Sequence, residues 1–456
     1  MINRRKFLKN SVAGLGVASG LASNFASFNA FAADTSDYKA LVCVFLTGGV
    51  DGHDILIPFD NSSYSDFARI RGSLITPSRR RENLLSLNGG FDGREFALPA
   101  EMLPLQELYN QGEMAFVGNV GPLIEPTNRT TFRNGTARLP PRIGSHNDSQ
   151  SIWMASQPEG ARSGWGGRFS DIMQAANANS NASFTSVSAA GRTIYLTGEN
   201  IQAFEVSSRG GLSVDELRSN SVLGSNVFAR NYEAVLRDSG RPESGNFFSM
   251  DMSNTMRKAI DDNDLLVSVL DGPGDPSTQF PATPLGGQFE IVARMIARRQ
   301  QLGAGRQIFF ISQGGYDTHR SQTEDLPELQ LDLASSMRAF HDSMVELGAS
   351  NNVTSFTASD FGRTLSRSGS GTDHGWGNHH MVMGGAVNGG QIEGDVPPPD
   401  FNHDADMGRG RLIPKVSVDQ YAAALGRWFG LSDSELLDAL PGLANFEANT
   451  LDSLFV

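Results

Sequence analysis

Five apolar runs along the chain have the composition of buried strands. They cover Tyr38–Thr47, Met114–Val117, Arg306–Ser312, Val353–Ala358 and Met381–Met383. Short apolar runs bounded by turn residues are typical of strands that are covered on both faces of a parallel sheet. Glycine pairs follow three of the runs, which indicates sharp turns where those strands end.

Helical periodicity appears between and after the later runs. From Leu326 to Leu347 apolar residues recur every three or four positions, as in a helix with one buried face. Two further helices are predicted over Ser417–Phe429 and Ser432–Leu440, and each begins at a serine suited to capping. Strands alternating with helices predict an α/β fold with a doubly wound, mostly parallel sheet flanked by helices.

Two stretches depart from this alternation. The region from about 177 to 275 is rich in Ser, Asn and Gly and has weak periodicity, so we expect a loop-rich insertion there. Ala386–Gly410 carries three consecutive prolines and several acids, which indicates a surface loop near the functional site.

The first 32 residues have the pattern of a twin-arginine signal peptide. Arg4 and Arg5 precede a large apolar pair and a lysine, and the uncharged stretch that follows ends in Ala30-Phe31-Ala32. We therefore expect residues 1–32 to be removed after export, leaving residues 33–456 as one domain. The expected partner is the twin-arginine export machinery, and the expected location is periplasmic or secreted, with no stable membrane span.

Charge and cysteine content narrow the function classes. The net charge is −13, and removal of the four basic residues of the signal peptide takes it to −17. An acidic surface argues against a nucleic-acid partner, because phosphate binding needs basic patches. Cys43 is the single cysteine and lies within an apolar run, so we expect a buried structural thiol and no disulfide.

Candidate chemistry is concentrated in loops that follow the predicted strands. In open parallel sheets, ligands bind beyond the carboxyl ends of the strands. The loops at Gly48–Asp54, Gly314–His319, Ser359–Thr364 and Gly371–His380 carry most of the histidines together with aspartates. Such side chains at one sheet edge favour a metal site over simple packing.

Five residues are the candidate ligands. Asp317 and His319, two apart at a strand end, can share one cation, and His374 lies among three histidines within seven residues. Asp51 is either a ligand or a helix cap, and Asp360 is the ligand candidate of its loop. Oxygen ligands with a few imidazoles favour Zn²⁺, Mn²⁺, Mg²⁺ or Ca²⁺ over copper or iron–sulfur.

Two further residues are candidates for catalysis. The segment Gly144–Trp153 opens a helix, where Ser149 or Ser151 is either a nucleophile or part of an ordinary cap. Arg363 either clamps an anionic substrate or pairs with an acid. Two adjacent divalent ions would suit hydrolysis of a phosphate or sulfate ester.

The order of these motifs, GGVDGHD, SHNDSQSIW, GGYDTH, SDFGRT and TDHGWGNHH, resembles the bacterial domain-of-unknown-function family 1501. That resemblance implies an exported protein with the fold of the alkaline phosphatase and sulfatase superfamily. It aligns Asp51, Asp317 with His319, Asp360 and His374 with the superfamily's metal ligands. Phe361 stands where the superfamily has a histidine, so the resemblance implies a reduced ligand set.

Two functions of different class are compatible with these motifs. The first is a metal-dependent hydrolase in which Ser149 or a water attacks a phosphate or sulfate ester and Arg363 steadies the anion. The second is a non-catalytic exported binding or assembly protein that keeps a structural cation. An anionic ester or an envelope polymer is the expected ligand.

Overall fold

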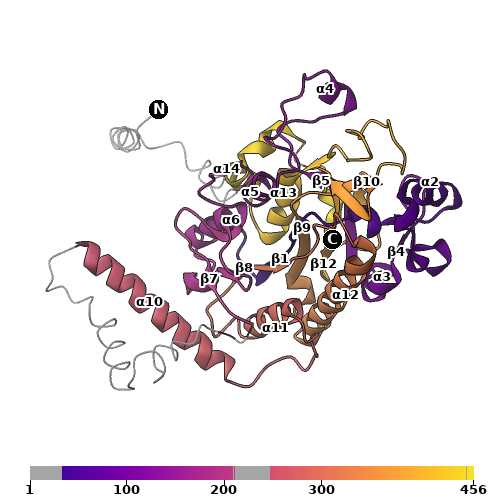
Figure 1. The fold of residues 1–456 in the computed structure, drawn as a ribbon. Helices are drawn as coiled ribbons and strands as arrows, with labels where there is room; N and C mark the ends of the chain where they lie inside the picture. The colour runs from indigo at the N-terminus through magenta and orange to yellow at the C-terminus, as the bar shows by residue number, and fades with distance from the viewer. Residues whose placement is uncertain (1–32, 209, 211–246, 448) are drawn as a thin grey trace, which may run out of the picture.

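The computed structural model describes residues 33–208, 210, 247–447 and 449–456. The predicted signal peptide, and residues 209 and 211–246 of the predicted insertion, lie outside this part of the chain. The molecule is mixed α/β, with a large, mostly parallel central sheet flanked by helices, as the sequence predicts (Figure 1).

The central sheet of the described residues has nine strands. All run in one direction except β12, which is antiparallel to both of its neighbours. Their order across the sheet is β13 (Ile392–Gly394), β5 (Met114–Gly121), β12 (Asn378–Met383), β9 (Val353–Ser359), β1 (Lys39–Leu46), β8 (Arg306–Gln313), β6 (Ser186–Ser188) and β7 (Phe204–Glu205), and β14 (Val416–Ser417) also pairs with β5.

The direction of β12 corrects one expectation. Its apolar run was expected to repeat the parallel pattern, but the hairpin β10 (Arg363–Ser368) and β11 (Gly371–His374) occupies the connection from β9. A parallel return needs a long crossover, usually a helix, whereas an antiparallel return does not. No helix lies between residues 359 and 378 of the described chain, so β12 runs back along β9.

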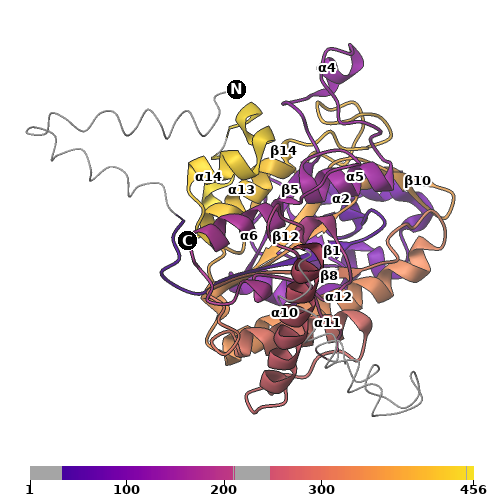
Figure 2. The same cartoon turned by 90° about the vertical axis from the view of Figure 1, so that its left-hand side faces the viewer.

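Helices cover both faces of the sheet (Figure 2). Buried apolar side chains form one large cluster on each face. One face carries α3 (Leu103–Gln111), α10 (Phe247–Leu270), α11 (Pro284–Ala297) and α12 (Gln322–Glu346), and the other carries α5 (His146–Ala155), α6 (Trp165–Ala175), α13 (Val418–Phe429) and α14 (Asp433–Ala439). The predicted helices at 326–347, 417–429 and 432–440 are confirmed within a few residues as α12, α13 and α14.

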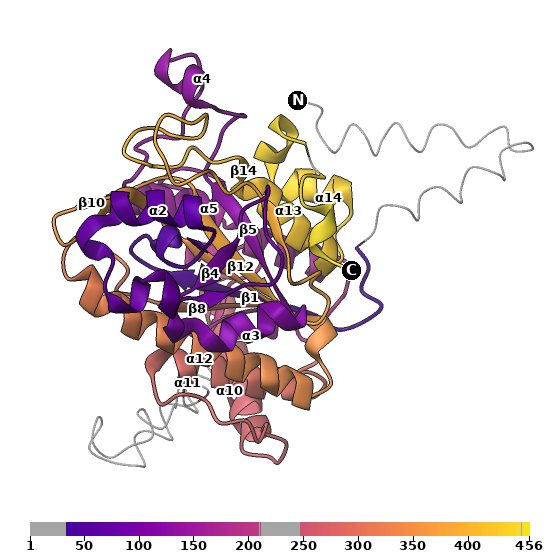
Figure 3. The same cartoon turned by 90° about the vertical axis from the view of Figure 1, so that its right-hand side faces the viewer.

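Two peripheral parts complete the described fold. A small antiparallel sheet lies beside α2 (Asn61–Arg71), to the left of the central sheet in Figure 3. Its strands are β2 (Ile57–Pro58), β4 (Phe96–Leu98) and β3 (Leu85–Ser86). The short helix α4 (Arg129–Arg133) stands out from the body on the segment between β5 and α5 (Figure 1).

The predicted insertion contributes to the central sheet. Its strands β6 and β7 extend the sheet beyond β8 at one edge, and α10 packs Leu266 and Leu270 into the core. The bounds proposed for the insertion stay a prediction, because part of the region lies outside the described residues. Cys43 is buried in β1 as expected, and burial raises the pKa of its thiol well above the usual value.

Candidate metal centre

The carboxyl ends of three neighbouring parallel strands form the floor of the candidate site. β9, β1 and β8 lie side by side in the sheet, so the loops that follow Ser359, Leu46 and Gln313 meet at one edge. The first residue of α5 and the last residue of β11 reach the same place from opposite sides. The fold thus brings all five histidine- and aspartate-bearing motifs to this edge, and four of them contribute side chains to the candidate site.

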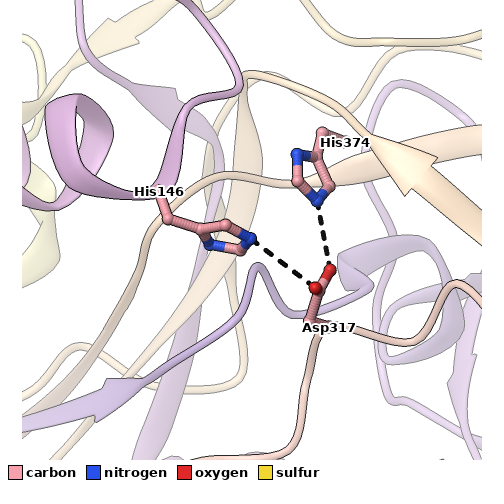
Figure 4. Close-up of side chains that lie close together, drawn as sticks. All are labelled: His146, Asp317 and His374. Carbon is pink, nitrogen blue, oxygen red and sulfur yellow. Dashed lines mark hydrogen bonds and ion pairs between the residues drawn. The ribbon is translucent and has the colours of Figure 1, made fainter.

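His146, Asp317 and His374 converge at this edge (Figure 4). One ligand atom from each lies within 4.8 Å of the other two. Asp317 is central: its Oδ1 is 3.1 Å from His374 Nε2, and its Oδ2 is 3.6 Å from His146 Nε2. Each comes from a different element, so folding assembles the group from distant parts of the chain.

The other ring nitrogen of each histidine fixes its orientation. His146 Nδ1 donates to Asp360 Oδ2 at 2.6 Å, and His374 Nδ1 donates to the Gly144 carbonyl at 2.8 Å. When each imidazole is neutral, its single proton lies on Nδ1, and Nε2 then presents a lone pair toward Asp317. Two such lone pairs beside a carboxylate suit a cation between them.

Asp360 supports this arrangement from below. Its side chain is fully buried and accepts hydrogen bonds from His146, from Gln150 and from the backbone N–H of Gly48. A carboxylate that holds a histidine in one tautomer is a common partner of metal-ligating imidazoles. The structure therefore places Asp360 behind the cluster, where it orients His146.

His319 lies beside the cluster. Its Nε2 is 2.8 Å from His374 Nε2 and 3.1 Å from Asp317 Oδ1. Partial burial and the nearby charge of Arg363 lower its pKa, and the opposing effect of Asp317 is smaller. The neutral form, which has a lone pair to offer a cation, is thereby favoured.

Asp317 is held in its ionised form. Partial burial tends to raise its pKa, but the close polar contacts with His374 and Arg363 outweigh this effect and lower the pKa. About half of the side chain remains exposed, so the cluster opens to solvent on one side. An ion held by these residues would be accessible to a further ligand from that side.

Phe361 fills the space beside the imidazoles of His146 and His374. Its ring centroid is 4.9 Å from that of His146 and 4.4 Å from that of His374. At this position the resemblance expects a histidine ligand, and an aromatic wall stands there instead. The ligand atoms of His146, Asp317 and His374 lie close enough to share an ion, and His319 contacts two of these three residues.

Three predicted site residues do not join the cluster. Asp51 is buried in a two-point ion pair with Arg71, at 2.6 and 2.8 Å, and also accepts from Gln322. Arg363 is fully buried and donates to surrounding carbonyl groups and to Asp317. Ser149 is buried in α5, and no hydrogen bond joins its hydroxyl to the cluster within the described residues.

His146 is a ligand candidate that the sequence did not reveal. It stands in the SHNDSQSIW motif, whose serines are the candidate nucleophiles. One signal was available: a buried strand-end aspartate such as Asp360 needs a partner, and a histidine opening a nearby helix can supply one.

Comparison with known proteins identifies a family match. A family model described as "Protein of unknown function (DUF1501)" matches residues 119–440. No curated protein matches the chain in sequence. Within the described residues, none of the helices combines the length and apolar character needed to cross a membrane.

Solved structures show only a distant likeness. The PsFucS1 sulfatase from Pseudoalteromonas sp. aligns at 10% identity with a TM-score of 0.33, covering 88% of this chain and 69% of that one. Ps i-CgsB in complex with k-i-k-neocarrahexaose aligns at 9% identity with a TM-score of 0.35, covering 91% and 78%.

Proposed function

Since the chain belongs to the DUF1501 family of proteins of unknown function, we propose a function from its candidate metal centre. In this proposal the protein binds one divalent cation through His146, Asp317 and His374 and hydrolyses a phosphate or sulfate ester. We also propose that the fold is of the alkaline phosphatase type.

The observation that carries the proposal is the convergence of His146, Asp317 and His374 at one sheet edge. When Nδ1 of each neutral imidazole donates to Asp360 or to the Gly144 carbonyl, both Nε2 atoms are available as acceptors beside the Asp317 carboxylate. Such a set is stable when a cation occupies its centre. Fixed tautomers and a half-open face are features of catalytic metal sites, which keep a position for substrate.

The donor set favours some metals over others. Two imidazoles and one carboxylate suit Zn²⁺ or Mn²⁺, whereas Mg²⁺ and Ca²⁺ prefer oxygen ligands throughout. When bound here, such an ion supplies Lewis-acid polarisation of an ester oxygen. His319, which contacts both Asp317 and His374, is placed to ligate the same ion or to exchange a proton with the substrate.

A non-catalytic role is the second candidate, and a specific observation favours it. The Ser149 hydroxyl makes no hydrogen bond to a base among the described residues, and Arg363 is enclosed and cannot clamp a substrate. A binding or assembly protein with a structural cation needs neither group. An anionic ester or an envelope polymer remains the proposed ligand in either case.

The test compares hydrolysis with and without metal. The full chain, purified without chelator, is assayed on aryl phosphate and aryl sulfate esters, then again after chelation and after readdition of Zn²⁺ or Mn²⁺. Hydrolysis that chelation abolishes, that metal restores and that His374→Ala lacks supports the hydrolase. A protein that binds metal at this site but hydrolyses neither ester class supports the binding or assembly role.

We also propose that the protein is exported through the twin-arginine machinery and acts in the periplasm or beyond. The motif around Arg4 and Arg5 supports this route. Replacing both arginines by lysine should retain the chain, uncleaved, in the cytoplasm. Unchanged export of that variant would contradict the proposed route.

A further inference from the structure

Arg363, at the start of β10, lies fully enclosed beneath the metal centre. Its side chain has no exposed surface, although it carries a permanent positive charge. Buried arginines are tolerated where their five N–H groups all find acceptors. The partners of Arg363 therefore show what it does.

Those partners are the ends of three strands. Nη1 is within hydrogen-bond distance of the carbonyls of Gly48, Gly49 and Tyr316, at 3.0 to 3.3 Å, and of Asp317 Oδ1 at 3.2 Å. Nε and Nη2 donate to the hydroxyl and the carbonyl of Thr372, at 2.9 and 2.8 Å. One guanidinium thus joins the loops after β1 and β8 to strand β11.

Gly48 connects this arginine to the other half of the site. Its carbonyl accepts from Arg363, while its N–H donates to Asp360, the carboxylate that orients His146. The residue has φ +116°, and a Cβ there would lie 2.5 Å from the backbone nitrogen of Asp317. Only glycine fits such a position, so the turn after β1 is built to let these groups meet.

The same network reaches Asp51. Thr372 Oγ1 donates to Gln322, and Gln322 donates to the Asp51 carboxylate, which is paired with Arg71. A continuous buried path of hydrogen bonds therefore runs from the Arg71–Asp51 pair to Asp317. Buried hydrogen-bond networks of this kind favour a single geometry.

We propose that Arg363 is a positioning residue for the cation site: it fixes the Asp317 carboxylate against His146 and His374 by tying three strand ends together. This inference rests on the proposed metal centre. It assigns to Asp51 and Gln322 a supporting role through Thr372, away from the ion.

The charge of Arg363 and its positioning role predict opposite effects on cation affinity when the residue is removed, which makes the inference testable. A fixed positive charge beside a cation site repels the ion, so an arginine that acted by charge alone would weaken binding. Its removal would then tighten binding. If Arg363 acts by position, removing it frees Asp317 and the affinity falls.

The experiment measures Zn²⁺ and Co²⁺ affinity by chelator competition on the full chain, together with the visible spectrum of bound Co²⁺ and the melting temperature. The variants are Arg363→Met, Arg363→Lys and the milder Thr372→Val. Arg306→Lys is the matched control, because Arg306 is equally buried and also donates to carbonyls, but at the opposite end of β8.

We expect Arg363→Met to weaken binding about 10- to 100-fold and to change the Co²⁺ spectrum, as for other residues that orient metal ligands. The affinity of Arg363→Lys should lie between those of the wild type and Arg363→Met, since an ammonium keeps the charge but cannot bridge two loops and strand β11. Thr372→Val, which changes the size of the side chain least, should weaken binding by a smaller factor. Arg306→Lys should lower the melting temperature and leave the affinity unchanged.

Folded Arg363 variants that bind as tightly as the wild type, or more tightly, with an unchanged spectrum would overturn the positioning role alone. A wild-type protein that binds no ion would overturn the proposed metal centre and this inference with it. The two failures are therefore distinguishable.

Discussion

Two groups of histidines, drawn in part from the same glycine-rich motif, have opposite surroundings. His374 ends strand β11 at the open edge of the sheet, with its Nε2 beside Asp317. His379 and His380 follow within six residues but lie inside β12, buried in the sheet. A cluster of histidines in sequence therefore does not define a metal site; the position of each along its strand does.

The electrostatics of the two groups differ in the same way. Burial lowers the pKa of His380 to about 3 and that of His379 well below the usual value, so both stay neutral as packed core groups. His374 and His146 instead face a carboxylate across a partly open space. The buried pair packs in the core, whereas we propose that the partly exposed pair binds a cation.

Removing Asp317 should break the metal site most completely. Asp317→Ala deletes the group that both Nε2 atoms face, so we expect metal affinity to fall by about 100-fold or more. The half-exposed side chain contributes little packing, and the unfolding free energy without metal should change by less than about 1 kcal/mol. Chelator competition and denaturant unfolding measure the two quantities.

Lowering the pH should destabilise the fold through the buried pair, His379 and His380. In the unfolded chain His379 and His380 take up protons as the pH falls through about 6.5, whereas in the folded protein they stay neutral. The free energy of unfolding is therefore highest above that pH and decreases as the pH falls below it. Between pH 6.5 and 5 we expect a loss of about 2 kcal/mol for each of the two. Urea titrations with chelator present check this, and His380→Phe should remove one such share.

Truncating His380 should have the opposite pattern of effects to Asp317→Ala: stability should fall and metal affinity should stay the same. The centroid of its ring lies 4.8 Å from that of Trp153, and the ring also stacks near Tyr421 in the core. His380→Ala leaves a cavity there, and we expect about 3 kcal/mol lower unfolding free energy. Metal affinity should be unchanged, and a large loss of affinity would show that the two groups are coupled.

Asp360→Asn is expected to have the smallest effect on metal affinity, and it changes the fewest atoms. The amide keeps the shape of the carboxylate but holds the His146 tautomer less firmly, so we expect about tenfold weaker metal binding. Asp317→Asn should weaken metal binding more than Asp360→Asn does. Equal effects would mean that Asp360 is itself a ligand.

The sheet could be predicted from the sequence because its strands are continuous apolar runs. β1, β5, β8 and β9 all lie where such runs predict them, since strands buried on both faces leave a strong local signal. The direction of β12 and the edge strands β6 and β7 could not be predicted. Their placement depends on connections and on distant partners, which short runs such as Ser186–Ser188 do not encode.

The site could be predicted in part for a similar reason. Asp317, His319 and His374 stand in strand-end loops, and the fold brings them together. Asp51 stands in an equivalent loop, but the buried Arg71 of α2 engages its carboxylate, and no local pattern announces that pairing. His146 escaped prediction because its role is created by Asp360, which lies 214 residues away.

Anomalous diffraction at the zinc edge, from crystals of the protein grown with Zn²⁺, tests the proposed metal centre most directly. If the three residues hold the ion, one strong peak should lie at about 2.0–2.2 Å from His146 Nε2, His374 Nε2 and an Asp317 oxygen. A peak bound elsewhere, or none at this edge of the sheet, would contradict the proposal.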